Sequence, residues 1–325
     1  MDNFTPPREL MRRRLEDKLR CELGSEVRKA LADPDVIEVM RNPDGQLWID
    51  TFSNGMRPAG AMTATQAECL ISTVATMLGV VVNTDRPILE AELPIDGSRI
   101  TAVVAPIGSS PIIAIRKHAS HILSLDDYVA SNALSSACAA ALRKSLSDRK
   151  NILIVGSAGS GKTTVANALL REISSQTDTS QRIVILEDTV ELQCSAPNHL
   201  VLRTSDTADL LALLRTTMRL RPDRIIVGEV RGAEALTLLK AWNTGHPGGI
   251  ATIHAGDCVG GLNRLDQLVQ EANVPSQSRL IAETVQIVIR VARSGCIRRI
   301  EEVAEVAAWS QDAGFRLAEK SSVDV

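Results

Sequence analysis

The sequence has 325 residues, an apolar fraction of 44% and a net charge of −3. At roughly 100–200 residues per domain, this length predicts two domains, and the apolar fraction excludes a largely disordered chain. A protein that coats nucleic acid usually presents a strongly basic surface, and one that stacks single-stranded bases needs aromatic side chains. This chain is nearly neutral and has three Phe, three Trp and one Tyr, which argues against both classes.

Targeting signals and cysteine spacing point to a cytoplasmic protein. No uncharged run reaches the roughly 18 residues that a membrane-spanning helix needs, and the first residues lack the apolar stretch of a signal peptide. The six cysteines are dispersed without a Cys-x-x-Cys pair, so their spacing predicts neither a zinc ribbon nor a disulfide framework. We therefore expect reduced thiols and a cytoplasmic location.

Helical and strand patterns alternate in the first part of the chain. Helices are predicted where apolar residues recur every fourth position, and strands where β-branched residues gather between turn residues. In chain order we expect a helix over 8–32, strands over 36–40 and 46–49, a helix from Thr63 or Thr65 to about Leu78, and strands within 88–118. The sequence thus predicts a small α+β N-terminal domain over residues 1–118.

Residues 119–130 contain no long periodic element and are predicted to be a linker. Beyond them, a helix is expected over 133–146, and short, wholly apolar runs at 152–155, 183–186 and 225–227 alternate with helical segments. Such runs are typical of a parallel sheet that is covered by helices on both faces. We expect an α/β domain over residues 131–325 that ends in antiparallel strands within 285–306.

The most specific motif is a phosphate-binding loop between an apolar strand and a helix. Its glycines let consecutive backbone N–H groups surround a phosphate, and the helix N-terminus adds positive potential. The lysine reaches the β- and γ-phosphates and the threonine hydroxyl ligates Mg²⁺, so ATP and Mg²⁺ are the expected cofactors. The predicted nucleotide-binding residues are Gly156, Ser157, Ala158, Gly159, Ser160, Gly161, Lys162, Thr163 and Thr164.

A second motif places three carboxylates after the apolar run 183–186, namely Glu187, Asp188 and Glu191. Carboxylates at the carboxyl end of a parallel strand share an edge with the phosphate loop, where a water must be oriented on the γ-phosphate. Taken alone, adjacent acidic residues after a strand are more typical of a turn or a helix cap. Beside a phosphate loop, a catalytic role is favoured.

A third motif follows the run 225–227, where Gly228 and Glu229 lie among several arginines. This position suits the strand that supports Mg²⁺ and its waters, at which most phosphate-loop enzymes carry Asp. For the surrounding arginines, a solvated or subunit-bridging face and a catalytic role both stay open.

Two histidines, His246 and His254, lie in a glycine-rich segment that includes an apolar strand. A lone histidine is usually structural, but this arrangement favours phosphate sensing by at least one of the two. Which of them contacts phosphate stays open at this point.

These four motifs, in this order, together resemble the traffic ATPases of type II and type IV secretion systems. The resemblance covers roughly residues 90–310 and is more specific than any single motif. The compact length is similar to the conjugal-transfer, TrbB-like branch. Pilus-assembly and type II members commonly carry a four-cysteine zinc insertion that this chain lacks, but retraction-type pilus motors also lack it and stay an alternative.

The resemblance implies a recombinase-like phosphate-loop NTPase domain with a mainly parallel sheet, and it implies roles for single residues. Glu187 would position or activate the attacking water, and Glu229 would support Mg²⁺ through its water shell. His254 would contact the γ-phosphate. In the N-terminal domain, Arg99 and Arg116 would approach the nucleotide, either to stabilise phosphate charge or only to close the domain.

The function implied by the resemblance is Mg²⁺-dependent ATP hydrolysis by a ring-shaped, hexameric motor. It would power conjugal DNA transfer, or the assembly of a type IV secretion channel or substrate transfer through it. Its partners would be further copies of the same chain and inner-membrane components of the apparatus. Through these components it would lie at the periphery of the inner membrane. Stable direct binding to nucleic acid is not expected. Alternatives are a pilus assembly or retraction ATPase, a nucleic-acid helicase or packaging motor, and a nucleotide-binding scaffold without hydrolysis.

Overall fold

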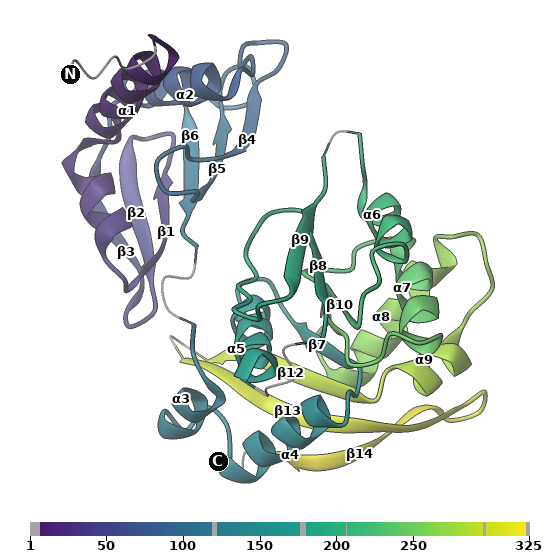
Figure 1. Ribbon diagram of the computed structural model, residues 1–325. Helices are drawn as coiled ribbons and strands as arrows, with labels where there is room; N and C mark the ends of the chain where they lie inside the picture. Colours follow the sequence, from purple (N-terminus) through teal and green to yellow (C-terminus); the bar gives the residue numbers. More distant parts are fainter. Residues whose placement is uncertain (1–6, 119–121, 176–179, 206, 295–296, 323–325) are drawn as a thin grey trace, which may run out of the picture. The chain divides into compact units, whose positions relative to one another are not determined.

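The chain divides into two compact units in a computed structural model that describes residues 7–118, 122–175, 180–205, 207–294 and 297–322 (Figure 1). Unit 1 comprises residues 1–121 and unit 2 comprises residues 122–325. Within the expected linker, residues 119–121 lie outside the described residues. Residues Leu125–Ala130 form a short helix, α3, whose Leu125 and Tyr128 are buried in the core of unit 2.

Unit 1 is a six-stranded antiparallel sheet with two helices. The strand order is β3-β2-β1-β6-β5-β4, and every neighbouring pair is antiparallel. The helices are α1 (Pro7–Ala32) and α2 (Ala64–Leu78), and the strands are β1 (Val36–Arg41), β2 (Gln46–Thr51), β3 (Gly55–Ala61), β4 (Ile88–Glu92), β5 (Arg99–Val103) and β6 (Ile112–Arg116).

Local signals explain the helices of unit 1. The Thr63 hydroxyl accepts a hydrogen bond from the backbone N–H of Gln66 and caps α2, which ends at Gly79 in the left-handed conformation at φ 69°. Every fourth residue of α1 faces inward, so that Leu19, Leu23 and Val27 are buried against α2 and the sheet. The helices predicted over 8–32 and from Thr63 to Leu78 are therefore confirmed.

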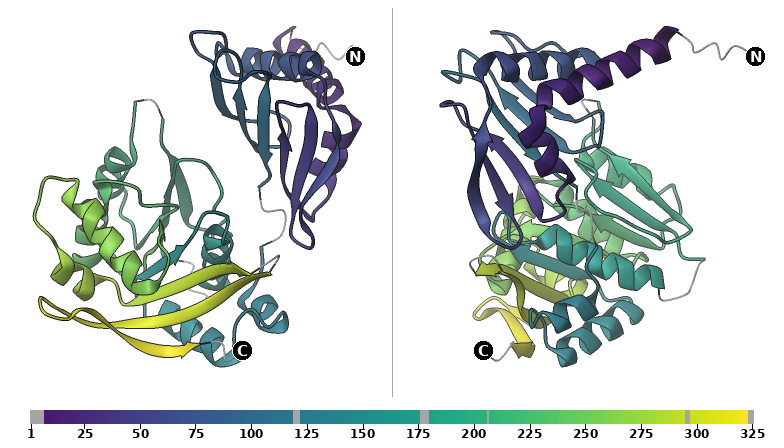
Figure 2. Two further views of the ribbon diagram at one scale, coloured as in Figure 1. Left: turned by 180° about the vertical axis from the view of Figure 1, so that it is seen from behind. Right: turned by 90° about the vertical axis from the view of Figure 1, so that its left-hand side faces the viewer.

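Unit 2 is built on an eight-stranded sheet in the order β14-β13-β12-β7-β11-β10-β8-β9. From β12 to β9 all neighbours are parallel, whereas β12, β13 and β14 run side by side as antiparallel neighbours (Figure 2). The strands are β7 (Ile152–Gly156), β8 (Ile183–Glu187), β9 (His199–Arg203), β10 (Arg224–Val227), β11 (Ile250–His254), β12 (Ile287–Ser294), β13 (Ile297–Ser310) and β14 (Gly314–Ser322). The further helices are α4 (Ser136–Ser147), α5 (Lys162–Ser175), α6 (Leu210–Thr217), α7 (Glu234–Asn243), α8 (Cys258–Gln270) and α9 (Ser278–Thr284).

Helices cover both faces of this sheet, which explains the wholly apolar strands. In β7, Ile152 and Ile154 belong to the core formed with α3, α4 and α5, whereas Leu153 and Val155 belong to the core formed with α6, α7, α8 and α9. Side chains that alternate between two cores must all be apolar. The predicted fold class, a small α+β part followed by an α/β part with a mainly parallel sheet, is confirmed. None of the described helices combines the length and the hydrophobicity that a membrane span requires.

A buried asparagine ties three segments of unit 2 together. The Asn151 side chain accepts hydrogen bonds from the N–H groups of Gly248 and Gly249, at 2.8 and 3.0 Å, and donates to the Thr284 carbonyl at 2.9 Å. These contacts hold the start of β11 and the approach to β12 against β7.

We predict that Asn151→Ala lowers the free energy of unfolding by about 2–4 kcal/mol, because it leaves buried backbone groups without their partner. Urea denaturation followed by circular dichroism measures the change. Asn243→Ala, at an exposed asparagine on the end of α7, is the matched control and should change little. Equal effects of the two substitutions would contradict the prediction.

Candidate active site

The phosphate loop joins the end of β7 to the start of α5 and depends on glycine at two positions. A Cβ at Gly156 would lie 2.4 Å from the Val291 carbonyl oxygen and 2.5 Å from Ser160 Oγ, so a larger residue does not fit. Gly161 has φ 101°, which strongly favours glycine. The loop is thus a tight turn against β12, at the carboxyl edge of the sheet.

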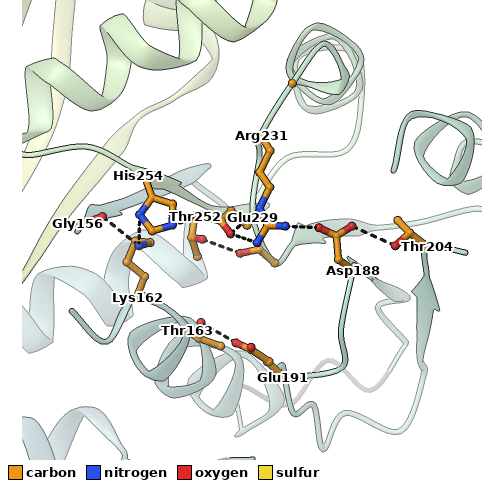
Figure 3. A network of polar contacts seen from close by, with 12 residues as sticks. Gly156, Lys162, Thr163, Asp188, Glu191, Thr204, Glu229, Arg231, Thr252 and His254 are labelled. Atoms are coloured by element: carbon orange, nitrogen blue, oxygen red, sulfur yellow. Dashed lines mark hydrogen bonds and ion pairs between the residues drawn. The ribbon is translucent and has the colours of Figure 1, made fainter. Parts of the chain in front are cut away.

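Lys162 lies within the curve of this loop. Only 8% of the residue is exposed, and Nζ donates to the carbonyls of Gly156 and Ser157, both at 3.0 Å. Nζ also lies 3.1 Å from Nδ1 of His254, which ends the neighbouring strand β11 (Figure 3). Lys162 therefore lies within the loop that the sequence predicts to bind phosphate, beside His254.

The two histidines lie at opposite ends of β11. His254 is at the carboxyl end, between Lys162 and Glu229, and its Nε2 lies 2.5 Å from Glu229 Oε1. His246 precedes the strand, and its Nδ1 lies 2.8 Å from the Pro222 carbonyl oxygen. The structure thus brings His254, and not His246, beside the phosphate loop.

Glu229 follows β10 and is held by an arginine. Its side chain is 17% exposed, and Oε2 accepts from Arg231 Nε at 2.8 Å and from Nη2 at 2.5 Å. Arg231 Nη1 also donates to Asp188 Oδ2 at 2.9 Å, and Asp188 Oδ1 accepts from the Thr204 hydroxyl at 3.1 Å. Figure 3 shows this line of contacts beside the phosphate loop.

Glu187 is the last residue of β8. Its side chain is buried, and Oε2 accepts hydrogen bonds from the backbone N–H groups of Glu191 and Leu192, both at 3.0 Å. A Cβ at Gly228 would lie 3.0 Å from Glu187 Cβ, so glycine lets β10 approach this side chain. These two hydrogen bonds of Glu187 shape the segment after β8, a role that its expected function in positioning water did not include.

The sequence placed Glu191 in the acidic motif but predicted no individual role for this third carboxylate. Glu191 Oε2 accepts a hydrogen bond from the Thr163 hydroxyl at 3.2 Å (Figure 3). Its main chain is fixed by the buried Asn167 of α5, whose Nδ2 donates to the Glu191 carbonyl and whose Oδ1 accepts from Gln193 N–H. The spacing of four residues from Glu187 was the signal, but the turn that directs Glu191 to the loop could not be read from it.

Arg298 of β13 is a further residue that sequence reasoning missed. Its Nε donates to the Gly159 carbonyl at 3.3 Å, and its Cδ would lie 2.8 Å from a Cβ at Gly161. A cation therefore lies against the two glycines at the tip of the phosphate loop. No local motif marks this arginine, because the contact joins segments that are far apart in sequence.

Arg99 and Arg116 lie in unit 1 on neighbouring strands. The register places them opposite each other on β5 and β6, with Glu92 opposite Arg99 and Glu38 opposite Arg116. They form the centre of a charged row across the sheet. Their expected approach to the nucleotide stays a prediction.

Sequence comparison places this chain among secretion proteins. The model of a family described as type II/IV secretion system protein matches residues 22–322. The conjugal transfer protein TrbB of Rhizobium radiobacter is 48% identical over 296 residues, which cover 91% of each chain. The type IV secretion system protein PtlH of Bordetella pertussis is 32% identical over 322 residues, with 87% of this chain and 92% of PtlH covered.

Solved structures share the fold at lower identity. The ATPase DotB of Legionella pneumophila has a TM-score of 0.61 at 17% identity, covering 94% of this chain and 82% of DotB. The pilus retraction motor PilT with bound ADP has a TM-score of 0.60 at 20% identity, covering 90% of this chain and 81% of PilT.

Proposed function

The chain belongs to the family of type II/IV secretion system proteins and is an ATPase, and we propose that its Mg²⁺-dependent ATP hydrolysis powers conjugal DNA transfer through a type IV secretion channel. The observation that carries this proposal is the meeting of Lys162, His254 and Glu229 at one edge of the sheet. A lysine in a phosphate loop stabilises charge on the transferred phosphoryl group. The 48% identity to a conjugal transfer protein favours conjugation over pilus retraction.

The residues at this edge fit a magnesium ion that arrives with the nucleotide. Mg²⁺ is usually held by one or two protein oxygens together with substrate phosphates, and not by a cage of side chains. Among the described residues, no group of three or more His, Cys, Asp or Glu side chains could hold a metal. The Thr163 hydroxyl, beside Glu191, and the Glu229 carboxylate would supply protein oxygens. The ion would neutralise charge on the β- and γ-phosphates.

For the water-positioning carboxylate, the contacts favour Glu191 over Glu187. The Glu187 carboxylate accepts hydrogen bonds from two backbone N–H groups, and these bonds order the segment that carries Glu191. Glu191 itself reaches the hydroxyl of Thr163 in the phosphate loop. We therefore treat Glu187 as a residue that shapes the site and Glu191 as the candidate base.

Phosphate release by the purified chain tests the proposed function. We expect turnover of ATP with Mg²⁺ and its loss when EDTA removes the metal. A chain that binds ATP but releases no phosphate with Mg²⁺ would overturn the ATPase part and favour a scaffold. In cells, a Lys162→Ala gene copy should fail to restore conjugal transfer to a strain that lacks the gene.

We expect the active form to be a hexameric ring. An ATP site that a neighbouring subunit completes needs a head-to-tail interface, and such interfaces close into rings. Light scattering at micromolar protein with a non-hydrolysable ATP analogue should give a mass near six chains. A monomer under these conditions would contradict the prediction. In the cell, we expect the ring to lie at the inner membrane through partner proteins.

We expect Arg116→Ala and Arg99→Ala to lower kcat, by up to about 10³–10⁵-fold if they stabilise phosphate charge as arginines do in related chemistry. Arg99 is half-buried and Arg116 is exposed, and neither belongs to the apolar core of unit 1, so folding should be unchanged. Separate measurement of kcat and nucleotide Kd distinguishes the roles, because an arginine that only closes the domain changes affinity more than turnover. No change in either quantity would make them ordinary strand residues.

A further inference from the structure

A line of polar contacts crosses the carboxyl edge of the sheet in unit 2 in the order of its strands (Figure 3). The strand order in this region is β7-β11-β10-β8-β9. At or just after the ends of these strands, in the same order, lie Lys162, His254, Glu229, Asp188 and Thr204. Within this line, Glu229 and Asp188 are both carboxylates. Their negative charges repel each other, and only a cation between them offsets that repulsion.

Arg231 supplies that cation. Nε and Nη2 both donate to Glu229 Oε2, at 2.8 and 2.5 Å, and Nη1 donates to Asp188 Oδ2 at 2.9 Å. A guanidinium group has its donors in a rigid plane, so one side chain can hold two carboxylates at a fixed separation. Asp188 is held in turn by the Thr204 hydroxyl at 3.1 Å.

The backbone that carries Arg231 is itself fixed. The N–H groups of Arg231 and Gly232 both donate to Glu234 Oε1 at the start of α7, at 2.7 and 2.9 Å. Val230 N–H donates to the Thr252 carbonyl of β11 at 2.9 Å. The arginine is exposed, but it extends from a segment that is tied on both sides, which an ordinary surface arginine is not.

The charges around Arg231 explain why an arginine is suited to this place. Burial opposes its charged form, but the hydrogen bond to Glu229 and the charges of Glu229, Asp188 and Glu191 raise the pKa of Arg231 above its usual value. The side chain therefore stays charged throughout the physiological range. Three carboxylates without this cation would concentrate negative charge where a triphosphate must enter.

We propose that Arg231 is a positioning residue for ATP hydrolysis, which holds the Glu229 carboxylate toward His254 and acts within its own subunit. This inference rests on the proposed ATPase function. Arg231 fixes Glu229 from one side, while His254 lies on the other side between Glu229 and Lys162. Loss of Arg231 would leave the phosphate loop itself in place but would release the Glu229 carboxylate, which would face the metal ion and its waters.

The test measures kcat by phosphate release and Kd with a fluorescent ATP analogue for the parent, Arg231→Ala and Arg231→Lys. We expect Arg231→Ala to lower kcat by about 10–100-fold, as a misplaced group does, with Kd changed less than about threefold. Arg231→Lys should recover only part of the lost kcat, because an ammonium group lacks the planar set of donors with which a guanidinium group holds two carboxylates. A kcat within about twofold of the parent, or a weakened Kd alone, would overturn the inference.

Arg279→Ala is the matched control, because Arg279 is an exposed helix arginine paired with Glu283 at 2.9 Å. It should leave kcat and Kd unchanged, and a loss equal to that of Arg231→Ala would make the effect non-specific and overturn the inference. If the parent itself releases no phosphate, the proposed function fails. If the parent is active and Arg231→Ala is equally active, only the positioning role fails.

Two further arms test how Arg231 acts. Asp188→Asn should lower kcat moderately, and its combination with Arg231→Ala should lose no more than Arg231→Ala alone, because Asp188 acts through the arginine. Additive losses of kcat would contradict the view that Asp188 acts through Arg231.

A mixture of Arg231→Ala and Lys162→Ala subunits should recover no activity, because each active site would still lack one of the two residues. Recovery in mixed oligomers would show that Arg231 serves a neighbouring subunit and would overturn the inference.

Discussion

Lys162→Ala is expected to lower ATP turnover by about 10²–10³-fold or more while the fold persists. The Lys162 ammonium group lies between the carbonyls of Gly156 and Ser157 and beside His254, in the loop that would surround a phosphate. Its removal eliminates charge stabilisation of the transferred phosphoryl group. The fold should persist because the apolar residues of α5, such as Leu169 and Leu170, supply the packing.

Phosphate release and circular dichroism measured on the same preparation check this result. Lys162→Met keeps the aliphatic part of the side chain and should lose as much activity, which separates loss of charge from loss of packing. Lys144→Ala removes an exposed lysine of α4 that pairs with Asp148 and should leave turnover unchanged. Activity of Lys162→Ala within a few-fold of the parent would refute the assignment of the phosphate loop.

The second large effect is expected at Glu191. Glu191→Gln should lower kcat by about 10²–10⁴-fold, because an amide cannot accept a proton from water. Nucleotide affinity should change little, since the amide oxygen still accepts the hydrogen bond from the Thr163 hydroxyl. Single-turnover phosphate release, together with Kd for a fluorescent ATP analogue, separates the chemical step from binding.

Glu187→Gln is the comparison that decides between the two carboxylates. Its amide oxygen can still accept from the N–H groups of Glu191 and Leu192, so we expect a smaller loss of turnover than in Glu191→Gln. Glu187→Ala, which leaves those N–H groups without their acceptor, should lower both stability and turnover. If Glu187→Gln loses turnover and Glu191→Gln keeps it, the role expected for Glu187 from the sequence stands.

Local sequence signals were enough to predict the strands that lie inside the sheet of unit 2, but not its edges. The interior strands β7, β8 and β10 contain the wholly apolar runs 152–155, 183–186 and 225–227, which stand out in any local window. β9 lies at the edge and alternates exposed and half-buried residues from His199 to Arg203, and it was not predicted. The same holds for the sheet of unit 1, whose edge strand β3 was not predicted. β3 contains Pro58, a residue that only edge strands tolerate readily.

The same limit applies to the active site. The conformation of the predicted phosphate loop could be read from consecutive residues, because glycine and the following helix determine it locally. That His254 and not His246 meets Lys162 depends on the direction of β11. The residues alone did not show that the strand ending at His254 lies beside and parallel to β7, so they left this choice open.

By itself, the sequence determined the fold class, the family resemblance and the residues of the phosphate loop, because periodicity and contiguous motifs act over a few residues. Only the tertiary structure decided that Glu187 is buried under its own loop, that Glu191 reaches Thr163, and that Arg231 joins Glu229 to Asp188. These contacts arise from the order β7-β11-β10-β8-β9, which places side by side strands that are distant in the chain. Helical crossovers and packing on both faces set that order, and no short segment of the sequence contains it.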